Sequence, residues 1–295
     1  MTAIDLSRLP APEVIETLDY ETIFAEMLAD LRSRAPEYSA LVESDPAYKI
    51  LQVSAYRELL LRQRLNEAAR SVMLAYAGGS DLEQLAALFG IERQIIDPGQ
   101  PDAPVPIPPT YEDIERFRQR IPLSLEGYST AGPVGAYIFH SLDTSALVKD
   151  VSVTSPAPGE VQVTLLSVEN DGTPSAELIT QVHDRLNDDD IRPLTDHVTV
   201  QAPAIVNYQI NATLVFYSGP GSQAVVTLAK EKVAEFVAQQ HKLGYDITLS
   251  GLYAALHQHG VQNVLLTSPA ADIIIQPNQA AYCTSIFIGP GGFDE

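Results

Sequence analysis

The sequence predicts an α+β protein with an N-terminal helical region that contains one long helix, followed by two small α+β domains. Three observations support this fold class. Residues 44–77 contain no Gly, and their only Pro stands where a helix would begin. Residues 97–109 are rich in Pro, which marks a domain boundary. From Val148 onward, apolar residues recur at every second position, which is the period of β-strands.

The long helix is predicted to begin after Asp45 and to continue to Ala77. Asp45 suits the N-cap position, Pro46 suits the first helical position, and Gly78-Gly79 would end the helix. At ~1.5 Å per residue the helix would be roughly 45–50 Å long, which is more than one compact domain needs.

Apolar side chains recur along this helix at alternating steps of three and four residues. Such heptad spacing predicts a seam that packs along another long helix. The members of the seam are Tyr48, Leu51, Ala55, Leu65, Ala69, Val72 and Tyr76.

Two charged residues, Glu58 and Arg62, fall in the middle of the seam. If they are buried, the pair would fix register or partner choice at a cost in desolvation. Alternatively, Leu59, Leu60 and Leu61 make the contact and leave the pair at a hydrated rim. We therefore predict a partner interface on this helix, which comprises Leu51, Ala55, Glu58, Leu59, Arg62, Leu65, Ala69, Val72 and Tyr76.

The N-terminal helical region is predicted to span residues 1–96. Residues before Asp19 are spaced by Pro and are expected to be extended, and a helix is predicted from Asp19 to Arg34, where Pro36 stops it. A third helix is expected to start at Ser80 or Asp81 and to close at Gly90. Residues 97–109 would form a stiff Pro-rich linker, or a ligand for a domain that binds Pro-rich segments.

The middle domain is predicted over residues 110–203. Thr110 and Asp113 resemble a capping box for a helix through Arg120, and a second helix begins near Pro133. Strands are predicted at 151–153, 161–165 and 197–201, with a helix that Ser175 caps before the last of them.

The C-terminal domain is predicted over residues 204–295. Its first strand ends at Phe216 and shows the clearest alternation in the chain. After a turn at Pro220-Gly221, Ser222 would cap a helix that Gly244 closes, and Thr248 or Ser250 would start another helix that ends at Gly260. Three strands are expected to follow, at 261–267, 272–276 and 282–288.

The composition excludes several classes of function. A net charge of −20 and a pI near 4.5 argue against nucleic acid as the main partner. No apolar run reaches the roughly 18 residues that span a membrane, and the N-terminus lacks the form of a signal peptide, so we expect a soluble protein made in a reducing cytoplasm. The long helix is locally basic, which fits an acidic protein partner or simply a solvated surface; its cations are Lys49, Arg57, Arg62, Arg64 and Arg70.

Four segments invite a chemical function, and none has the pattern that it needs. His257 and His259 point about 200° apart on a helix and could not share one metal ion. The run at 188–190 lacks the order of a calcium loop and is predicted to be a solvated acidic turn. Residues 218–222 lack both glycine-rich phosphate motifs. Cys283 is the only cysteine, so we expect no disulfide, no Cys-based metal site and a small core residue. The sequence predicts no catalytic residue, cofactor or metal.

One pattern of residues runs from Pro36 to Arg93, including SDPAYKILQVSAYRELLLRQRLNEAAR, and continues through STAGPVGAYIFH, VKDVSVTSPAPGEVQVTLLS, DGTPS, IRPLTDHVTV and LGYDITLSGLYAALHQHGVQNVLLTSP. It resembles the sequence of the J-like baseplate wedge proteins of contractile-tailed phages and phage-tail-like bacteriocins. It covers most of the chain in order. Gln52 stands where an acidic residue is more usual in this family, and Leu65 stands where Ile is.

The resemblance implies a non-enzymatic structural component of the baseplate wedge. Its expected partners are a second copy of itself, an I-like wedge protein, and other baseplate and sheath-adaptor proteins, assembled in the host bacterial cytoplasm into a phage tail or tail-like particle. The N-terminal helices would bundle with these partners, and the C-terminal domains would join neighbouring wedges to control sheath contraction. The alternatives are a non-catalytic assembly chaperone, and a hydrolase or binding module of the same particle.

Overall fold

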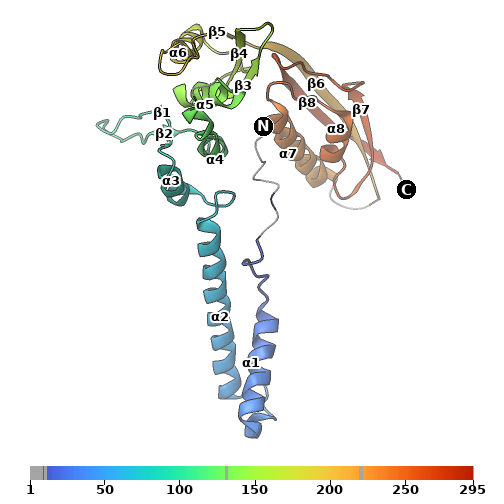
Figure 1. Ribbon diagram of the computed structural model, residues 1–295. Coiled ribbons are helices and arrows are strands. Elements are labelled where there is room, and N and C mark those ends of the chain that lie inside the picture. Colours follow the sequence, from blue (N-terminus) through green and yellow to red (C-terminus); the bar gives the residue numbers. More distant parts are fainter. Residues whose placement is uncertain (1–8, 10–11, 130–131, 219–221, 295) are drawn as a thin grey trace. The chain divides into compact units, whose positions relative to one another are not determined.

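The structure of this chain is a computed structural model that describes residues 9, 12–129, 132–218 and 222–294 (Figure 1). The fold class predicted from the sequence is confirmed, since N-terminal helices precede two parts that each contain a small sheet. The chain divides into two compact units, unit 1 (Met1–Glu92) and unit 2 (Arg93–Glu295).

Unit 1 is helical. It contains α1 (Tyr20–Arg34), a short 3₁₀ turn (Pro36–Tyr38), α2 (Pro46–Ser71) and α3 (Gly79–Ala87). The predicted start of the first helix is confirmed, because Asp19 is its N-cap and its carboxylate accepts a hydrogen bond from the Thr22 amide at 2.8 Å.

The long helix is shorter than the sequence predicts. It ends at Ser71, where the chain enters a turn closed by the Ala77 amide on the Met73 carbonyl at 2.8 Å. Ala77, at the end of this turn, is buried. Asp45 does occupy the N-cap position, but its carboxylate accepts from the Val42 amide at 2.9 Å and not from the helix.

The third helix also begins differently from the prediction. Its N-cap is Gly78, so Ser80 and Asp81 lie inside its first turn and do not cap it. Gly90, with φ +69°, follows the end of this helix, as predicted.

Unit 2 begins with a narrow hairpin. Strand β1 (Ile95–Asp97) pairs antiparallel with β2 (Thr110–Tyr111), and an isolated bridge joins Gln100 and Ile107. The Pro-rich segment therefore connects two paired strands and does not run on as an extended spacer. The following helix starts after Asp113, whose carboxylate accepts from the amides of residues 115 and 116, so Thr110 does not cap it.

The middle part of unit 2 places two helices on one face of a three-stranded sheet. Its elements are α4 (Ile114–Leu123), a 3₁₀ turn (Glu126–Tyr128), α5 (Val134–Thr144), β3 (Val148–Thr154), β4 (Glu160–Ser167), α6 (Ala176–Leu186) and β5 (His197–Gln201). Strand β4 is central, antiparallel to β3 and parallel to β5. The core packs α5 and α6 against the sheet, and the Ser175 hydroxyl caps α6 as predicted.

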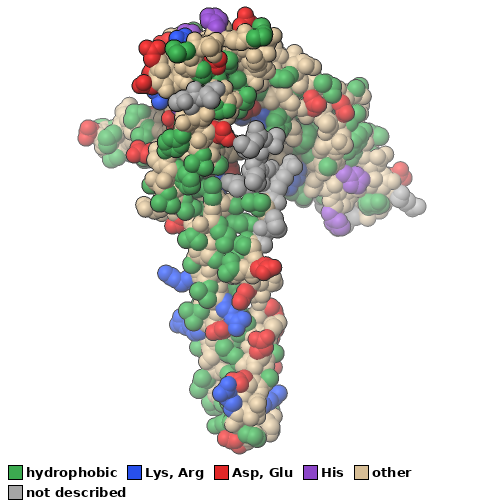
Figure 2. Space-filling model, in the orientation of Figure 1, with side chains coloured by type: hydrophobic (Ala, Val, Ile, Leu, Met, Phe, Trp, Pro, Cys, Tyr) green, Lys and Arg blue, Asp and Glu red, His purple; other side chains and the backbone are tan. Residues whose placement is uncertain are grey.

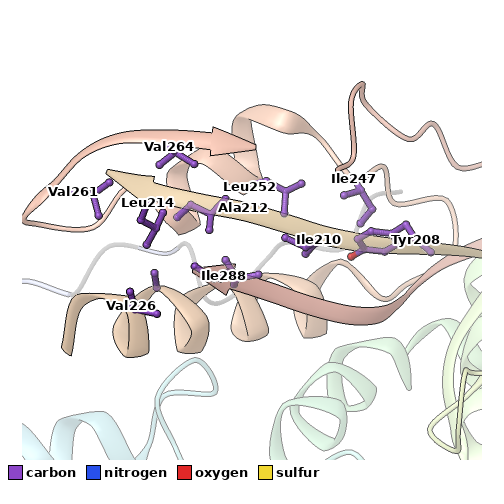
Figure 3. Packing of buried hydrophobic residues seen from close by; sticks show 14 of the residues in the cluster. Tyr208, Ile210, Ala212, Leu214, Val226, Ile247, Leu252, Val261, Val264 and Ile288 are labelled. Carbon is purple, nitrogen blue, oxygen red and sulfur yellow. The ribbon is translucent and has the colours of Figure 1, made fainter. Parts of the chain in front are cut away.

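The C-terminal part of unit 2 contains a second sheet, which packs against two helices of its own (Figure 3). Its elements are β6 (Ala204–Phe216), α7 (Ser222–Gln240), α8 (Leu249–Leu256), β7 (Val261–Ser268) and β8 (Gln279–Phe293). Strand β6 is central, antiparallel to β7 and parallel to β8. Its buried side, which includes Tyr208, Ile210, Ala212 and Leu214, meets both helices.

The C-terminal part differs from the prediction at one strand and at one helix end. The strand expected at 272–276 is only an isolated bridge between Ile273 and Ile247. Helix α8 ends at Leu256, before the predicted Gly260. Its N-cap is Thr248, one of the two residues that the sequence predicts for that position. The turn at 220–221 lies outside the described residues.

A buried network of charges lies in the middle part of unit 2. The Glu112 side chain is 0% exposed and accepts hydrogen bonds from the guanidinium groups of Arg116 and Arg120. Arg120, which is also buried, donates to the Asp143 carboxylate at 2.6 Å. Buried charges are tolerated only when they are paired in this way.

The same network holds neighbouring backbone in place. Arg116 donates to the carbonyls of Leu142 and Ser145 at 2.6 and 2.7 Å, so it satisfies the C-terminal end of α5. Glu112 accepts from the Gln94 amide at 2.8 Å, which fixes the base of the β1–β2 hairpin.

Two histidines of unit 2 are expected to make its stability depend on pH. Burial is the main cause that lowers the pKa of both His140 and His241 below the ordinary 6.5. The unfolded chain therefore binds more protons as the pH falls below about 6.5, so stability is present above that pH and is lost as the pH falls towards the folded-state pKa values.

The expected result is a lower urea midpoint for unit 2 at pH 5.5 than at pH 7, with a smaller difference in the variant H140Q/H241Q. An equal pH dependence in the variant would show that other groups cause it.

Candidate assembly surface

The inner face of α2 packs against α1 within the same chain. Ile23 and Phe24 of α1 meet Ala55, which is 0% exposed, in a small apolar cluster. The Phe24 and Tyr48 rings make an edge contact with centroids 4.9 Å apart. Partly buried side chains complete this cluster, namely Tyr20, Met27, Leu28, Tyr48, Leu51 and Leu59. The first half of the predicted seam therefore already has a helical partner in its own chain.

The charged pair in the seam is formed and partly hydrated. The Arg62 Nε lies 2.9 Å from Glu58 Oε1, and both side chains remain about one third exposed. The Glu16 carboxylate lies 3.7 Å from the same guanidinium. Of the two interpretations that the sequence allows, the geometry of this chain favours the hydrated rim.

Asn66 is a buried polar contact that the sequence analysis missed. Its side-chain oxygen accepts from the Glu16 amide at 3.1 Å, and its nitrogen donates to the Glu16 carbonyl at 2.8 Å. These two bonds tie the segment before α1 to the second half of α2. The sequence feature that could have indicated this contact is an Asn beside the seam, between Leu65 and Ala69.

The other predicted interface residues lie towards the end of α2 and beyond it. Leu65 is 69% exposed, and Ala69 is half-buried. Val72 and Tyr76 follow the end of the helix, and the Tyr76 hydroxyl lies 3.4 Å from the Leu9 carbonyl. Seven of the nine predicted residues therefore lie on α2, and the other two follow its end.

A second apolar face of α2 points away from α1, and we call it the outward stripe. At about 100° per residue, its members lie roughly opposite Ala55 on the helix. They are exposed, with fractions of 68% for Ile50 and 61% for both Val53 and Leu61. The stripe comprises Ile50, Val53, Leu60 and Leu61.

Positive charge accompanies the outward stripe. Arg57 and Arg64 lie on the same side of α2, between and beyond its apolar members. Helix α2 carries five cationic residues but only two acidic ones, Glu58 and Glu67. A shallow depression is lined by Arg57, Leu60, Leu61, Gln63, Arg64 and Glu67. Figure 2 shows hydrophobic side chains along the α1–α2 hairpin, interrupted by charged groups.

None of the described segments that invite a chemical function lies in a site that could carry one out. His257 is the C-cap residue that follows α8, and His259 lies in the turn after it. Asp188 accepts a hydrogen bond from the Asp190 amide in an exposed turn. Residues 219–221 lie outside the described residues. Cys283 is half-buried in β8, and burial raises the pKa of its thiol.

Two absences hold for the described part of the chain. It contains no group of His, Cys, Asp and Glu side chains placed to hold a metal ion. No described helix combines the length and apolar character that would cross a membrane.

The chain matches three family models in order along its length. Residues 43–100 match the baseplate J-like N-terminal domain, residues 129–202 match the baseplate J-like central domain, and residues 208–289 match the C-terminal domain of baseplate J-like proteins.

A full-length relative agrees with these matches. The chain is 46% identical over 302 residues to baseplate protein J of Escherichia phage P2, with all of both chains covered. It also has a weaker structural likeness to a chain in the sixfold-symmetrised cryo-EM structure of the anti-feeding prophage baseplate. That likeness has 12% identity and a TM-score of 0.40, and it covers 60% of this chain and 44% of the other. From the three domain matches and the full-length relative, this chain belongs to the baseplate J-like protein family.

Proposed function

We propose that this chain is a structural, non-enzymatic component of the baseplate wedge of a contractile tail. In this proposal the outward stripe of α2 packs against helices of a second copy and of an I-like wedge protein. The C-terminal part of unit 2 joins neighbouring wedges and controls sheath contraction, and other baseplate and sheath-adaptor proteins bind around it. Assembly takes place in the host cytoplasm. Family membership supports the place in a baseplate, and the outward stripe supports the mode of contact.

The outward stripe carries this proposal because folding of the hairpin does not use it. The opposite side of α2 already packs against α1, and yet Ile50, Val53 and Leu61 remain largely exposed. Fully burying one such side chain is worth about 1.5–3 kcal/mol, so covering several of them against a partner would stabilise a complex. The neighbouring Arg57 and Arg64 favour a partner helix with acidic residues beside its own apolar seam.

The variant Leu61→Asp tests the proposal. It places a negative charge in the proposed contact and leaves the α1 contact untouched. We expect at least a tenfold loss of wedge partners recovered with tagged chain after co-expression, because the variant gives up the apolar contact of Leu61, worth about 1.5–3 kcal/mol, and adds a carboxylate that must be desolvated.

The matched control is Leu194→Asp, since Leu194 is 99% exposed in unit 2. This variant is expected to recover the partners as the natural chain does. Full recovery of the partners by the folded Leu61→Asp chain would refute the outward stripe as the contact surface.

A further inference from the structure

The two parts of unit 2 are joined by a short connection. Strand β5 ends at Gln201 and β6 begins at Ala204, so only Ala202 and Pro203 lie between the middle and C-terminal sheets. Each part has a separate hydrophobic core on its own sheet. The geometry of a single link between two independently packed bodies allows rotation unless other contacts prevent it.

The apolar contact between the two parts is small. It consists of Leu166 from β4, Leu243 and Ala280 from the C-terminal part, and the partly buried Ile205. The cores on either side contain many more buried residues than this cluster. The apolar contact alone is therefore a weak restraint on the orientation of the C-terminal part.

Asp150 adds a directional contact to this joint. Its Oδ2 accepts a hydrogen bond from the Leu243 amide at 2.8 Å, and its Oδ1 accepts from its neighbour, the Val151 amide, at 2.9 Å. The pairing of β3 with β4 shifts register between Val148 and Asp150. Such an irregularity changes the direction in which a side chain leaves a strand.

The surroundings of Asp150 disfavour the charged form of its side chain. Burial raises the pKa of its carboxyl group, and the hydrogen bonds from the Leu243 and Val151 amides, followed by the charges of Lys242 and Lys149, oppose this rise. A carboxylate that is disfavoured by burial and yet bonds a backbone amide of the other part has a positioning role that an apolar residue could not fill.

A close approach elsewhere at the joint also depends on one residue. Gly172 has φ +95°, and a Cβ atom there would lie 2.5 Å from Leu166 Cδ1 and 3.0 Å from His241 Nε2. His241 belongs to the C-terminal part, where its Nδ1 lies 2.7 Å from the Ala281 carbonyl oxygen. The absence of a side chain at position 172 therefore lets the two parts close onto each other.

We propose that Asp150 is the latch of a hinge at Ala202–Pro203, and that its bond to the Leu243 amide holds the C-terminal part of unit 2 in one of two orientations. When the bond opens, the C-terminal part turns about the two-residue connection while both cores stay intact. The inference rests on the proposed function in one respect: the latch gives a wedge component a way to change the orientation of the part that joins neighbouring wedges.

The hinge can be measured on the isolated full-length chain. Spin labels on E177C and K230C, in a C283S background, report the distance between exposed positions on α6 and α7. We expect one narrow distance distribution for this background and a distribution at least twice as wide for the additional variant Asp150→Ala. The matched control is Asp189→Ala, which removes an exposed carboxylate far along the sequence from the joint and should leave the distribution narrow.

A second variant tests the joint without altering Asp150. Gly172→Ala inserts a methyl group between Leu166 and His241 and is also expected to broaden the distribution. The latch is refuted if a folded Asp150→Ala chain keeps the narrow distribution, or if Gly172→Ala does so where Asp150→Ala fails to fold. Because these measurements need no partner, their failure is distinct from failure of the Leu61→Asp co-purification test.

Discussion

Glu112→Gln is expected to destabilise unit 2 by about 3–5 kcal/mol. The substitution removes the one carboxylate that both Arg116 and Arg120 share, and leaves two buried guanidinium groups around a neutral amide. Breaking a buried charge pair on one side typically costs this much, because the remaining charge stays desolvated. Urea unfolding followed by circular dichroism would show the change as a lower midpoint.

The control for this prediction is Glu115→Gln in the first turn of α4, three residues further along the chain. Glu115 pairs with Arg118 at 3.2 Å, but its side chain is 60% exposed. An exposed pair contributes at most about 1 kcal/mol, so the midpoint should move little. If both variants lower stability equally, the buried network does not stabilise unit 2 more than an exposed ion pair does.

Ala55→Asp is expected to separate α1 from α2. Ala55 is 0% exposed where α1 crosses it, and a carboxylate there would have no partner in the cluster of Ile23 and Phe24. Burying an unpaired charge costs several kcal/mol, which is more than this small cluster can offset. Hydrogen exchange should show loss of amide protection along α1, with unit 2 unchanged.

The adjacent Ser54→Asp provides the matched comparison, because Ser54 is exposed on the same helix. It should keep the protection of α1. Retained protection in Ala55→Asp would mean that the contact between the two helices is not the one described. This pair of variants separates the inner face of α2 from its outward stripe, which Leu61→Asp tests.

Periodicity explains why most elements could be predicted. The strand that ends at Phe216 alternates because only one of its faces packs on helices, and Ser175 and Thr248 cap helices because their hydroxyl groups lie within reach of free amides. Such signals depend on neighbours in sequence. The prediction of a strand at 272–276 was wrong, because a strand needs a partner strand to pair with and this segment forms one isolated bridge.

The buried network could not be recognised from the sequence. Glu112, Arg116 and Arg120 recur every four residues, which is the spacing of a solvated face of charges on a helix. Only the packing of α4 against the end of α5 turns that face inwards, where the carbonyls of Leu142 and Ser145 accept from Arg116.

The sequence by itself determined the fold class, the family and the presence of a long helix that has apolar residues on more than one side. Which of those sides is free was decided by the tertiary structure, because α1 folds back onto Ala55 and leaves Ile50, Val53 and Leu61 exposed. The physical reason is that helical periodicity records which residues share a face, whereas the neighbour that covers a face comes from a distant part of the chain. The bond between Asp150 and Leu243 joins residues 93 positions apart and could be found only in the folded chain.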